Sequence, residues 1–311
     1  AELWPRVSRA ITYFESFDIA DGGLVPADPR YWLFLDWTDG LPRTGCPTLL
    51  NMMLLEALES AADLAEIVRP GGASDRVRPL AETLRRTIET RLWDEASGRF
   101  HDGIGADGVP FQTHAIHNQV QAVLCGLHPE AHETIGAEVL HPFLMGTSNE
   151  TAQPTPFWMT YVYEAARRLG LNDAALQHLA KKWAPMIETG GTWERFDPPG
   201  TGNTSGSHAW SAHPLYHLPR IAAGLTPATP GWGRVRFEPP LRFRGCSSVK
   251  TTIPTPNGVI SASWQRNSRS ADVTLDLPQD VVASVVLPGE QAEASTGLSR
   301  WSVTLPGISG G

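Results

Sequence analysis

Residues 47–93 have the sequence PTLLNMMLLEALESAADLAEIVRPGGASDRVRPLAETLRRTIETRLW, in which two amphipathic runs flank a break. In the first run, at 47–68, apolar residues recur at the three- and four-residue spacing of a helix that faces a core. Proline and paired glycines at 70–72 end this run, and a second helical run follows at 74–93. Because so short a loop leaves its two helices antiparallel, the stretch predicts an α-hairpin.

The same helical spacing continues along most of residues 1–225. Further helices are predicted at 1–17, 114–127, 129–140, 156–170, 172–187 and 211–224. Together with the hairpin at 47–93, these segments predict three antiparallel pairs with one further helix at each end. A turn with a short β-hairpin is predicted at 95–103. No sequence motif repeats at a fixed period, which argues against a solenoid of similar repeats.

After Leu225 the pattern changes from helical spacing to strict alternation. Short alternating runs separated by turn residues follow one another between residues 229 and 306. They predict a small antiparallel β-sandwich. We therefore expect a mostly α-helical protein with two domains, a helical-hairpin domain at 1–225 and a C-terminal β-sandwich domain at 226–311.

Composition limits the classes of partner. The chain has 311 residues, with 25 Lys and Arg against 33 Asp and Glu and a net charge of −8. This balance argues against nucleic acid or an anionic membrane as a partner, because both need a basic face. No apolar run approaches the roughly 20 residues of a membrane span.

The cysteines give no sign of a disulfide framework or a metal site. Cys46, Cys125 and Cys246 lie far apart, and no C-x-x-C or Cys/His cluster is present. A reducing, cytoplasmic location is the resulting expectation. We predict no metal and no cofactor.

The segment from Gly190 to Arg220 places Glu194 between Trp193 and Arg195, ahead of a loop rich in glycine. Burial against the indole would raise the pKa of the carboxyl, and the guanidinium would lower it. A general base must be ionised at working pH, which a nearby cation favours. The alternative is a cluster that only ties a loop to a helix.

A second candidate segment, FLDWTDG, carries Asp36, Trp37 and Asp39. Sugar sites combine an indole, which stacks on the apolar face of a pyranose, with carboxylates that accept hydrogen bonds from hydroxyl groups. The alternative is that Trp32 and Trp37 belong to the core and that Asp39 caps a turn.

Histidines accompany both segments. His213 and His217 lie four apart on a predicted helix, a spacing that can bind a metal. No acidic residue lies between them and a proline does, so we interpret them as ordinary helix residues. His208 and Asn118 each lie at a helix start, where contact with a sugar hydroxyl and helix capping are both open.

Several ordered motifs are similar to those of the bacterial α-L-rhamnosidases of glycoside hydrolase family 78. They are FLDWTDG, LWDEASGRFHDG, HNQVQAVLCGL, TWERFDP and SHAWSAHPLYHLPRIAAGLTPATPGWGRVRFEPPL. The resemblance covers nearly the whole chain. It implies an (α/α)6 toroid of helical hairpins, an inverting mechanism and a carbohydrate ligand, a rhamnoside.

The resemblance also implies roles for individual residues. Glu194 corresponds to the general base that activates water, and His208 to a histidine that contacts the sugar near that base. Asp36 and Trp37 correspond to pocket-lining residues, and His117 to a pocket-side histidine. The remaining expected substrate-binding residues lie beside these in the same motifs: Asp39, Trp193, Arg195 and Trp210.

One part of the family pattern has no counterpart. The family's general acid lies in an upstream stretch rich in Asp, Arg and Glu, and Asp36 and Asp39 fit hydroxyl acceptors better than that acid. The resemblance thus implies an N-terminally truncated toroid, weak or absent activity of this chain alone, and self-association, as a homo-oligomer, that covers exposed helical faces.

Two other classes of function remain open. A carbohydrate-binding, non-catalytic protein would keep the pocket without the chemistry. A lyase or phosphorylase on the same fold is less consistent with the residues, since a lyase for uronates needs a basic site and GTGNTSG at 200–206 lacks the lysine of a phosphate loop.

Overall fold

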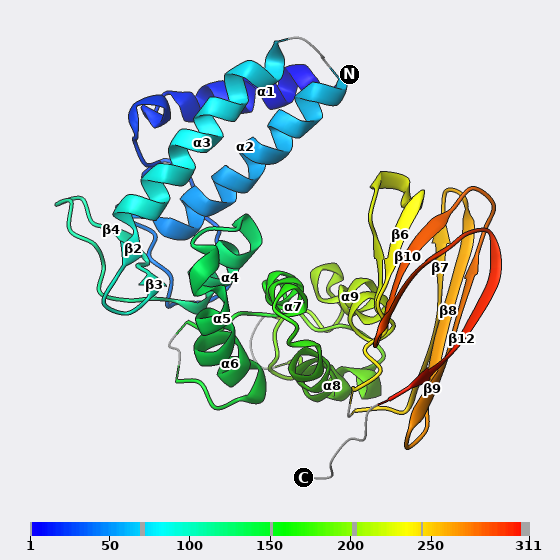
Figure 1. Cartoon of the computed structure of the whole chain (residues 1–311). Helices are drawn as coiled ribbons and strands as arrows, with labels where there is room; N and C mark the ends of the chain where they lie inside the picture. The colour runs from blue at the N-terminus through cyan, green and yellow to red at the C-terminus, as the bar shows by residue number, and fades with distance from the viewer. Residues whose placement is uncertain (1, 69–71, 150–151, 201–203, 244, 306–311) are drawn as a thin grey trace. The chain divides into compact units, whose positions relative to one another are not determined.

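The chain folds into two compact units, Ala1–Leu169 and Gly170–Gly311. The computed structural model describes residues 2–68, 72–149, 152–200, 204–243 and 245–305. The first unit is mainly helical, and the second combines helices with β-sheets (Figure 1).

In the first unit the long helices α2 and α3 lie side by side, which confirms the predicted hairpin (Figure 1). The helices of this unit are α1 (Trp4–Glu15), α2 (Thr48–Val68), α3 (Ala73–Arg91), α4 (Ile116–Cys125), α5 (His132–Ile135), α6 (His141–Met145) and α7 (Met159–Arg168). Between α5 and α6 the chain remains helical as a π-helical segment, Gly136–Leu140. The helix predicted at 129–140 therefore extends to Met145.

Four very short strands pair at one end of the α2–α3 hairpin. They are β1 (Cys46–Pro47), β2 (Trp93–Asp94), β3 (Arg99–Phe100) and β4 (Gly103–Ile104). β2 pairs with β3 across a tight turn, which confirms the predicted β-hairpin, and β1 pairs with β4. Gly45 precedes β1 with φ +64°, and a Cβ there would lie 2.2 Å from the carbonyl oxygen of Ile104, so the close pairing requires glycine.

Helix α4 lies in the interior of the first unit. Nine of its ten residues are buried. A helix that is buried all round has to satisfy its polar side chains with protein partners. The polar residues of α4 are His117, Asn118, Gln119 and Gln121, and they therefore reach out to other segments of the unit.

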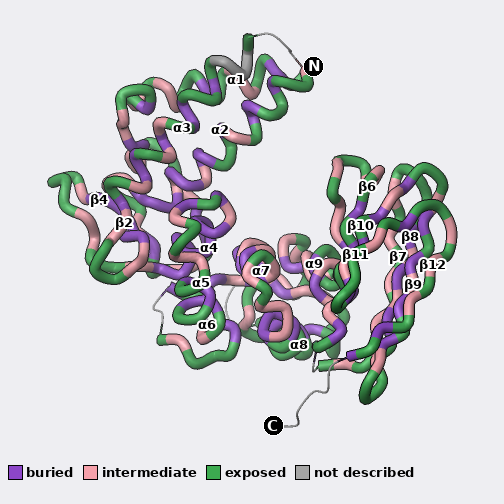
Figure 2. Tube along the Cα trace, viewed as in Figure 1, coloured by how far each residue is buried: buried purple, intermediate pink, exposed green. Residues whose placement is uncertain are grey.

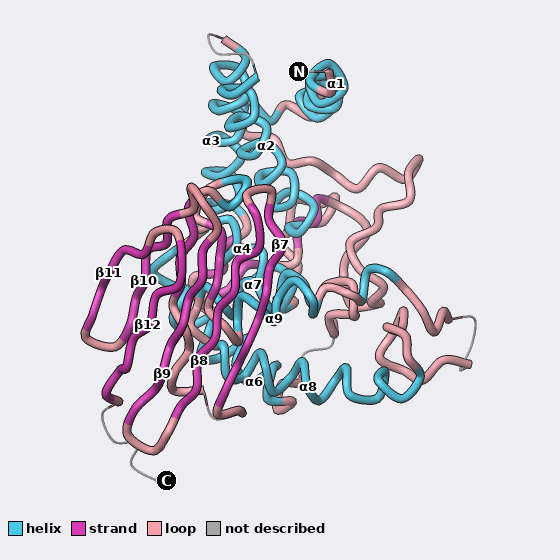
Figure 3. The backbone as a smooth tube through the Cα atoms, turned by 90° about the vertical axis from the view of Figure 1, so that its right-hand side faces the viewer, coloured by secondary structure: helices cyan, strands magenta, loops and turns pink. Residues whose placement is uncertain are grey.

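The described part of the second unit contains the α-helices α8 (Asn172–Thr189) and α9 (Pro214–Ile221) and two four-stranded sheets, whose longer strands run side by side in Figure 3. The sheets have the strand orders β11-β10-β6-β5 and β12-β9-β8-β7. The strands are β5 (Leu225–Pro227), β6 (Arg234–Phe237), β7 (Ser248–Thr255), β8 (Gly258–Arg266), β9 (Ser270–Leu277), β10 (Val282–Leu287), β11 (Glu290–Ala294) and β12 (Gly297–Thr304). Neighbouring strands pair antiparallel, except that β6 and β10 pair in parallel.

Alternation along the strands builds the core of the sandwich. Buried and exposed positions alternate in β6, β9 and β10, so one face of each strand packs inward (Figure 2). Trp264 of β8 is buried, and its indole nitrogen donates to the carbonyl of Ala222, 2.9 Å away, just after α9. This bond fastens the sheet to the helix that precedes it.

Gly224 makes the turn from α9 into the sandwich possible. Its φ is +74°, and a Cβ at this position would lie 1.9 Å from the carbonyl oxygen of Glu238. The amide of Glu238 donates to the carbonyl of Gly224 at 2.8 Å, which holds the two backbones in close approach. Only glycine combines this conformation with this contact.

The third predicted helix pair is divided between the units, since α7 belongs to the first and α8 to the second. Across the part of the chain that the structure describes, no helix is long and apolar enough to span a membrane.

A buried histidine in α8 makes the stability of the second unit depend on pH. Burial lowers the pKa of His178 to about 4, and the charges of Lys182 and Lys181 act in the same direction. An unfolded histidine takes up its proton near pH 6.5. The contribution of His178 to the free energy of unfolding is therefore fully present above pH 6.5 and is lost as the pH falls from 6.5 toward 4.

We expect this one group to lower the free energy of unfolding by about 2 kcal/mol at pH 5 relative to pH 7. Urea unfolding of the wild type and of His178→Gln at both pH values measures it, since the variant should lack this share of the pH dependence. His141→Gln, at an exposed position of α6, is the control and should keep the wild-type pH dependence. Equal pH dependence in wild type and His178→Gln would contradict the assignment.

Candidate active site

Glu194 lies in a loop of the second unit that is held by a backbone ladder. The amide of Glu194 donates to the carbonyl of Ser205 at 3.0 Å, and the amide of His208 donates to the carbonyl of Thr192 at 2.7 Å. The hydroxyl of Thr192 donates back to the carbonyl of His208 at 2.9 Å. The segment that carries Glu194 therefore runs beside the segment that carries His208. Residues 201–203, which include Gly202 of the glycine-rich loop, lie outside the described residues.

The carboxylate of Glu194 is anchored through one oxygen atom. The amide of Ser205 donates to Oε2 at 2.8 Å, and Nδ1 of His208 lies 3.9 Å from the same oxygen. No hydrogen bond to Oε1 is found among the residues that the structure describes. The side chain of Glu194 is 21% exposed. One oxygen is thus fixed by the protein, and the carboxylate still reaches solvent.

The tryptophans on either side of this carboxylate have different environments. Trp193 is buried, and its indole nitrogen donates to the hydroxyl of Thr189 at 2.7 Å. Trp210 packs against the ring of His208 with centroids 3.9 Å apart, and its indole nitrogen donates to the carbonyl of Glu194 at 3.3 Å. The structure therefore brings Glu194, His208 and Trp210 together, whereas Trp193 is buried.

Arg195 and the paired histidines of α9 differ in exposure. Arg195 is exposed, whereas His217 is fully buried. The rings of His213 and His217 pack edge to face with centroids 5.3 Å apart, and His213 also packs on Trp183. These contacts are those of packed helix residues, as the sequence analysis expected.

In the first unit Asp36 has no exposed surface, and each of its oxygen atoms has two hydrogen-bond partners. Oδ1 accepts from the amide of Trp37 at 2.7 Å and from the hydroxyl of Thr155. Oδ2 accepts from the amide of Thr155 at 3.0 Å and lies 3.0 Å from Nε2 of His117, which is also fully buried. The structure thus places Asp36 and His117 against each other, whereas the sequence analysis expected both to face a ligand. No sequence signal pointed to Thr155.

Trp37 and Asp39 lie at the surface beside that buried pair. Trp37 is 38% exposed and Trp32 is 67% exposed, so neither is a core residue. Their rings pack together with centroids 5.6 Å apart, and Phe34 and Phe157 complete an aromatic cluster. Exposed indole faces next to an acidic side chain suit a sugar ring, whose apolar face stacks while its hydroxyl groups donate.

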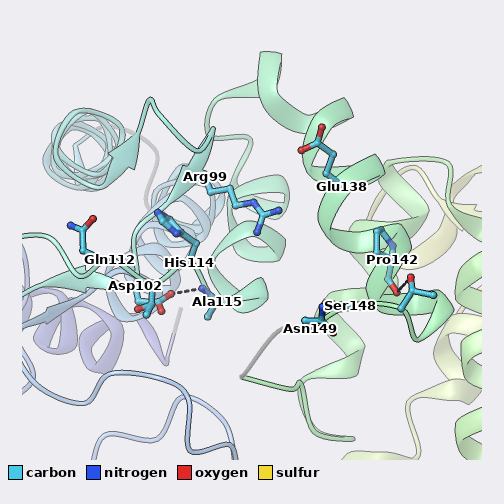
Figure 4. A pocket seen from close by; sticks show the side chains of 11 residues that line it. Arg99, Asp102, Gln112, His114, Ala115, Glu138, Pro142, Ser148 and Asn149 are labelled. Atoms are coloured by element: carbon cyan, nitrogen blue, oxygen red, sulfur yellow. Dashed lines mark hydrogen bonds between the residues drawn. The ribbon is translucent and has the colours of Figure 1, made fainter.

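The first unit also contains a cavity of about 460 Å³ that the sequence did not indicate. Figure 4 shows Arg99 and His114 on one wall and Glu138 and Asn149 on the opposite wall. Asp102 also lines it, and its Oδ1 accepts from the amide of Ala115 at 2.6 Å. The cavity is lined mainly by polar and charged side chains.

One group of side chains beside this cavity has the composition of a metal site. Asp94, His101 and His114 each offer a ligand atom, and these atoms all lie within 4.8 Å of one another. From the sequence we expected no metal, because no C-x-x-C or Cys/His cluster is present. The β2–β3 hairpin and the loop before α4 bring the three residues together.

The two acids of FLDWTDG should respond differently to neutralisation. Asp36→Asn places an amide group where donors converge, so we expect it to lower the free energy of unfolding by about 3 kcal/mol. Asp39→Asn, at an exposed position, should change it by less than about 0.5 kcal/mol. Urea unfolding of both variants makes the comparison. Equal stability of the two variants would show that the buried hydrogen bonds of Asp36 contribute little.

Comparison with known proteins identifies the family. A family model described as the bacterial alpha-L-rhamnosidase 6 hairpin glycosidase domain matches residues 2–222, and one described as the bacterial alpha-L-rhamnosidase C-terminal domain matches residues 224–301. A curated α-L-rhamnosidase from Alteromonas sp. (strain LOR) is 27% identical over 145 residues, which are 43% of this chain and 15% of that protein.

Solved structures show the same relationship over more of the chain. The family 78 rhamnosidase of Bacillus sp. GL1 is 26% identical with a TM-score of 0.77, over 92% of this chain and 30% of that one. The α-L-rhamnosidase of Streptomyces avermitilis, complexed with L-rhamnose, is 19% identical with a TM-score of 0.74, over 97% and 30% of the two chains. This chain thus spans less than a third of the length of these relatives. The expected fold is confirmed, and the chain belongs to the bacterial α-L-rhamnosidase family, with its six-hairpin glycosidase and C-terminal β domains.

Proposed function

We propose that this chain carries the general base of an inverting α-L-rhamnosidase and that Glu194 is that base. The observation that carries the proposal is the asymmetry of its carboxylate. Oε2 is held by the amide of Ser205 at 2.8 Å, and no described residue forms a hydrogen bond to Oε1. A general base needs a fixed position and a free lone pair that faces the water it activates.

The chemistry of an inverting hydrolase defines what Glu194 does. Water attacks the anomeric carbon from the face opposite the leaving oxygen, and Oε1 takes one proton of that water as the new C–O bond forms. The glycosidic C–O bond breaks, and its oxygen takes a proton from a general acid. The two carboxyl groups of such enzymes stand about 6.5–9.5 Å apart, which leaves room for the water. We assign no residue of this chain to the acid.

The neighbours of Glu194 divide into contact and positioning residues. His208 is 31% exposed and lies beside the carboxylate, so it can bind a sugar hydroxyl group next to the base. Trp210 packs on the ring of His208 and fixes the carbonyl of Glu194, and its ring is the proposed sugar-stacking surface here. Arg195 is exposed and offers donors for sugar hydroxyl groups. Trp193 is buried, so its role is to hold the backbone.

In the first unit we assign carbohydrate contact to Trp37 and Asp39, which are exposed. Asp36 and His117 are fully buried and act as positioning residues, since Asp36 holds the amide of Trp37 at 2.7 Å. The family match supports a rhamnoside as the ligand. The complex of the Streptomyces avermitilis relative with L-rhamnose is consistent with it.

The test uses rhamnosides that differ in their need for a general acid. The 4-nitrophenolate group leaves without being protonated, whereas an alkoxide leaves only when a general acid protonates its oxygen. If Glu194 is the base, this chain should hydrolyse 4-nitrophenyl α-L-rhamnoside slowly and methyl α-L-rhamnoside not measurably. Glu194→Gln should lower the rate on the nitrophenyl substrate about 100-fold or more. Absorbance of released 4-nitrophenolate measures it.

Glu188→Gln is the matched control, because Glu188 is an exposed glutamate at the end of α8 in the same unit. Azide adds a second readout, since it attacks without needing a base. With Glu194→Ala it should restore turnover and give the β-L-rhamnosyl azide of inverted configuration. Unchanged hydrolysis by Glu194→Gln would overturn the assignment. Rhamnose binding without hydrolysis, retained in Glu194→Gln, would instead indicate a non-catalytic carbohydrate-binding protein.

A further inference from the structure

Three side chains with metal-ligand chemistry converge in the first unit. Nε2 of His114 lies 2.9 Å from Oδ2 of Asp94, and the rings of His101 and His114 are stacked with centroids 5.0 Å apart. The hydroxyl of Ser97 also donates to Oδ2 of Asp94 at 2.7 Å. Two imidazoles and a carboxylate form a common donor set for zinc.

A second observation at the same place points to a ligand. His101 is only 8% exposed, and its Nδ1 is a buried nitrogen atom with no hydrogen-bond partner. A buried polar atom without a partner is costly, so native structures usually satisfy it with a protein group, a water molecule or an ion. One ring nitrogen of His101 lies within 4.8 Å of a carboxylate oxygen of Asp94 and a ring nitrogen of His114.

The backbone that carries His101 is held on both sides. The amide of His101 donates to the carbonyl of Leu92 at 2.9 Å, and its carbonyl accepts from the hydroxyl of Thr48 at 2.6 Å. Gln119 of α4 makes two hydrogen bonds to the backbone of the preceding residue, Phe100, each 2.9 Å long. Such supporting contacts orient metal ligands before the ion arrives.

We propose that Asp94, His101 and His114 bind a divalent zinc ion, as three protein ligands with an open fourth position. His114 lines the 460 Å³ cavity, so a water molecule can complete the coordination from that side (Figure 4). Three protein ligands and one water satisfy the four-coordinate preference of zinc.

The distances require only a small adjustment. Ligand atoms about 2.0–2.1 Å from a tetrahedral zinc ion lie about 3.3 Å apart. Nε2 of His114 and Oδ2 of Asp94 are 2.9 Å apart, and all pairs of ligand atoms lie within 4.8 Å. Side-chain rotations that move these atoms by up to about 1.5 Å therefore bring them to that spacing. Asp94 supplies one negative charge to the ion. The cavity that His114 lines is also lined by two carboxylates, Asp102 and Glu138, and by the guanidinium of Arg99.

The ion would join the β-hairpin to the loop that precedes α4. Asp94 belongs to β2 and His101 directly follows β3, whereas His114 lies in the loop before α4. Binding would therefore fasten the β-hairpin to the start of the buried helix. A ligand that binds only the folded chain stabilises it in proportion to the logarithm of its concentration over its dissociation constant.

Zinc titration calorimetry of the whole chain tests the proposal. We expect one zinc ion per chain, and His114→Gln and Asp94→Asn should each weaken binding about tenfold or more. His141→Gln removes an exposed histidine of α6 and should bind zinc as the wild type does. Circular dichroism of each variant verifies that it is folded.

Two further measurements distinguish this site from loose association with surface histidines. Cobalt(II) in the wild type should give the intense visible bands of a tetrahedral site, and His114→Gln should lose them. Zinc at about 100 times its dissociation constant should raise the melting temperature of the wild type by about 5 °C. Equal zinc affinity of wild type, His114→Gln and Asp94→Asn, or octahedral cobalt spectra, would overturn the proposal.

Discussion

The carboxylate of Asp36 is withdrawn from water, so the protein has to supply every hydrogen bond that its two oxygen atoms need. His117 of α4 is one of the partners, and the other polar residues of α4 are placed in the same way. Asn118 donates to Asp102 at 2.6 Å, and Gln121 donates to Glu56 of α2 at 2.8 Å. The buried helix α4 thus connects several segments through hydrogen bonds. A segment that shifted along the helix would leave these buried polar side chains without partners, so the bonds fix a register that apolar contacts alone would not.

The two carboxylates that the sequence singled out have opposite environments, and this difference supports the separate roles proposed for them. Asp36 is closed in by four donors, which suits a residue that holds the loop of Trp37 in place. Glu194 is tied through one oxygen and reaches solvent, which suits proton transfer. Carboxyl groups of one protein acquire separate functions through such differences in burial and hydrogen bonding.

Periodicity predicted the elements because it reflects which faces are buried. The α2–α3 hairpin, the β2–β3 turn and most strands of the sandwich follow directly from it, while β5 and β11 are too short or too irregular in burial to give a signal. Contacts between distant segments leave no such signature. Nothing in the sequence joins Asp36 to Thr155, or His101 to His114, because tertiary folding alone brings them within reach.

The loop of Glu194 shows how an irregular segment acquires a fixed geometry. Trp183 of α8 donates from its indole nitrogen to the carbonyl of Ser211 at 2.9 Å, and the hydroxyl of Ser211 donates to the carbonyl of Trp193. A chain of hydrogen bonds therefore runs from a regular helix to the residue before Glu194. Catalytic groups need positions that side-chain packing and hydrogen bonds hold to within a fraction of an ångström. Because Ser211 and Trp193 are both buried, water does not compete for these bonds, and the loop can remain rich in glycine while its carboxylate stays in place.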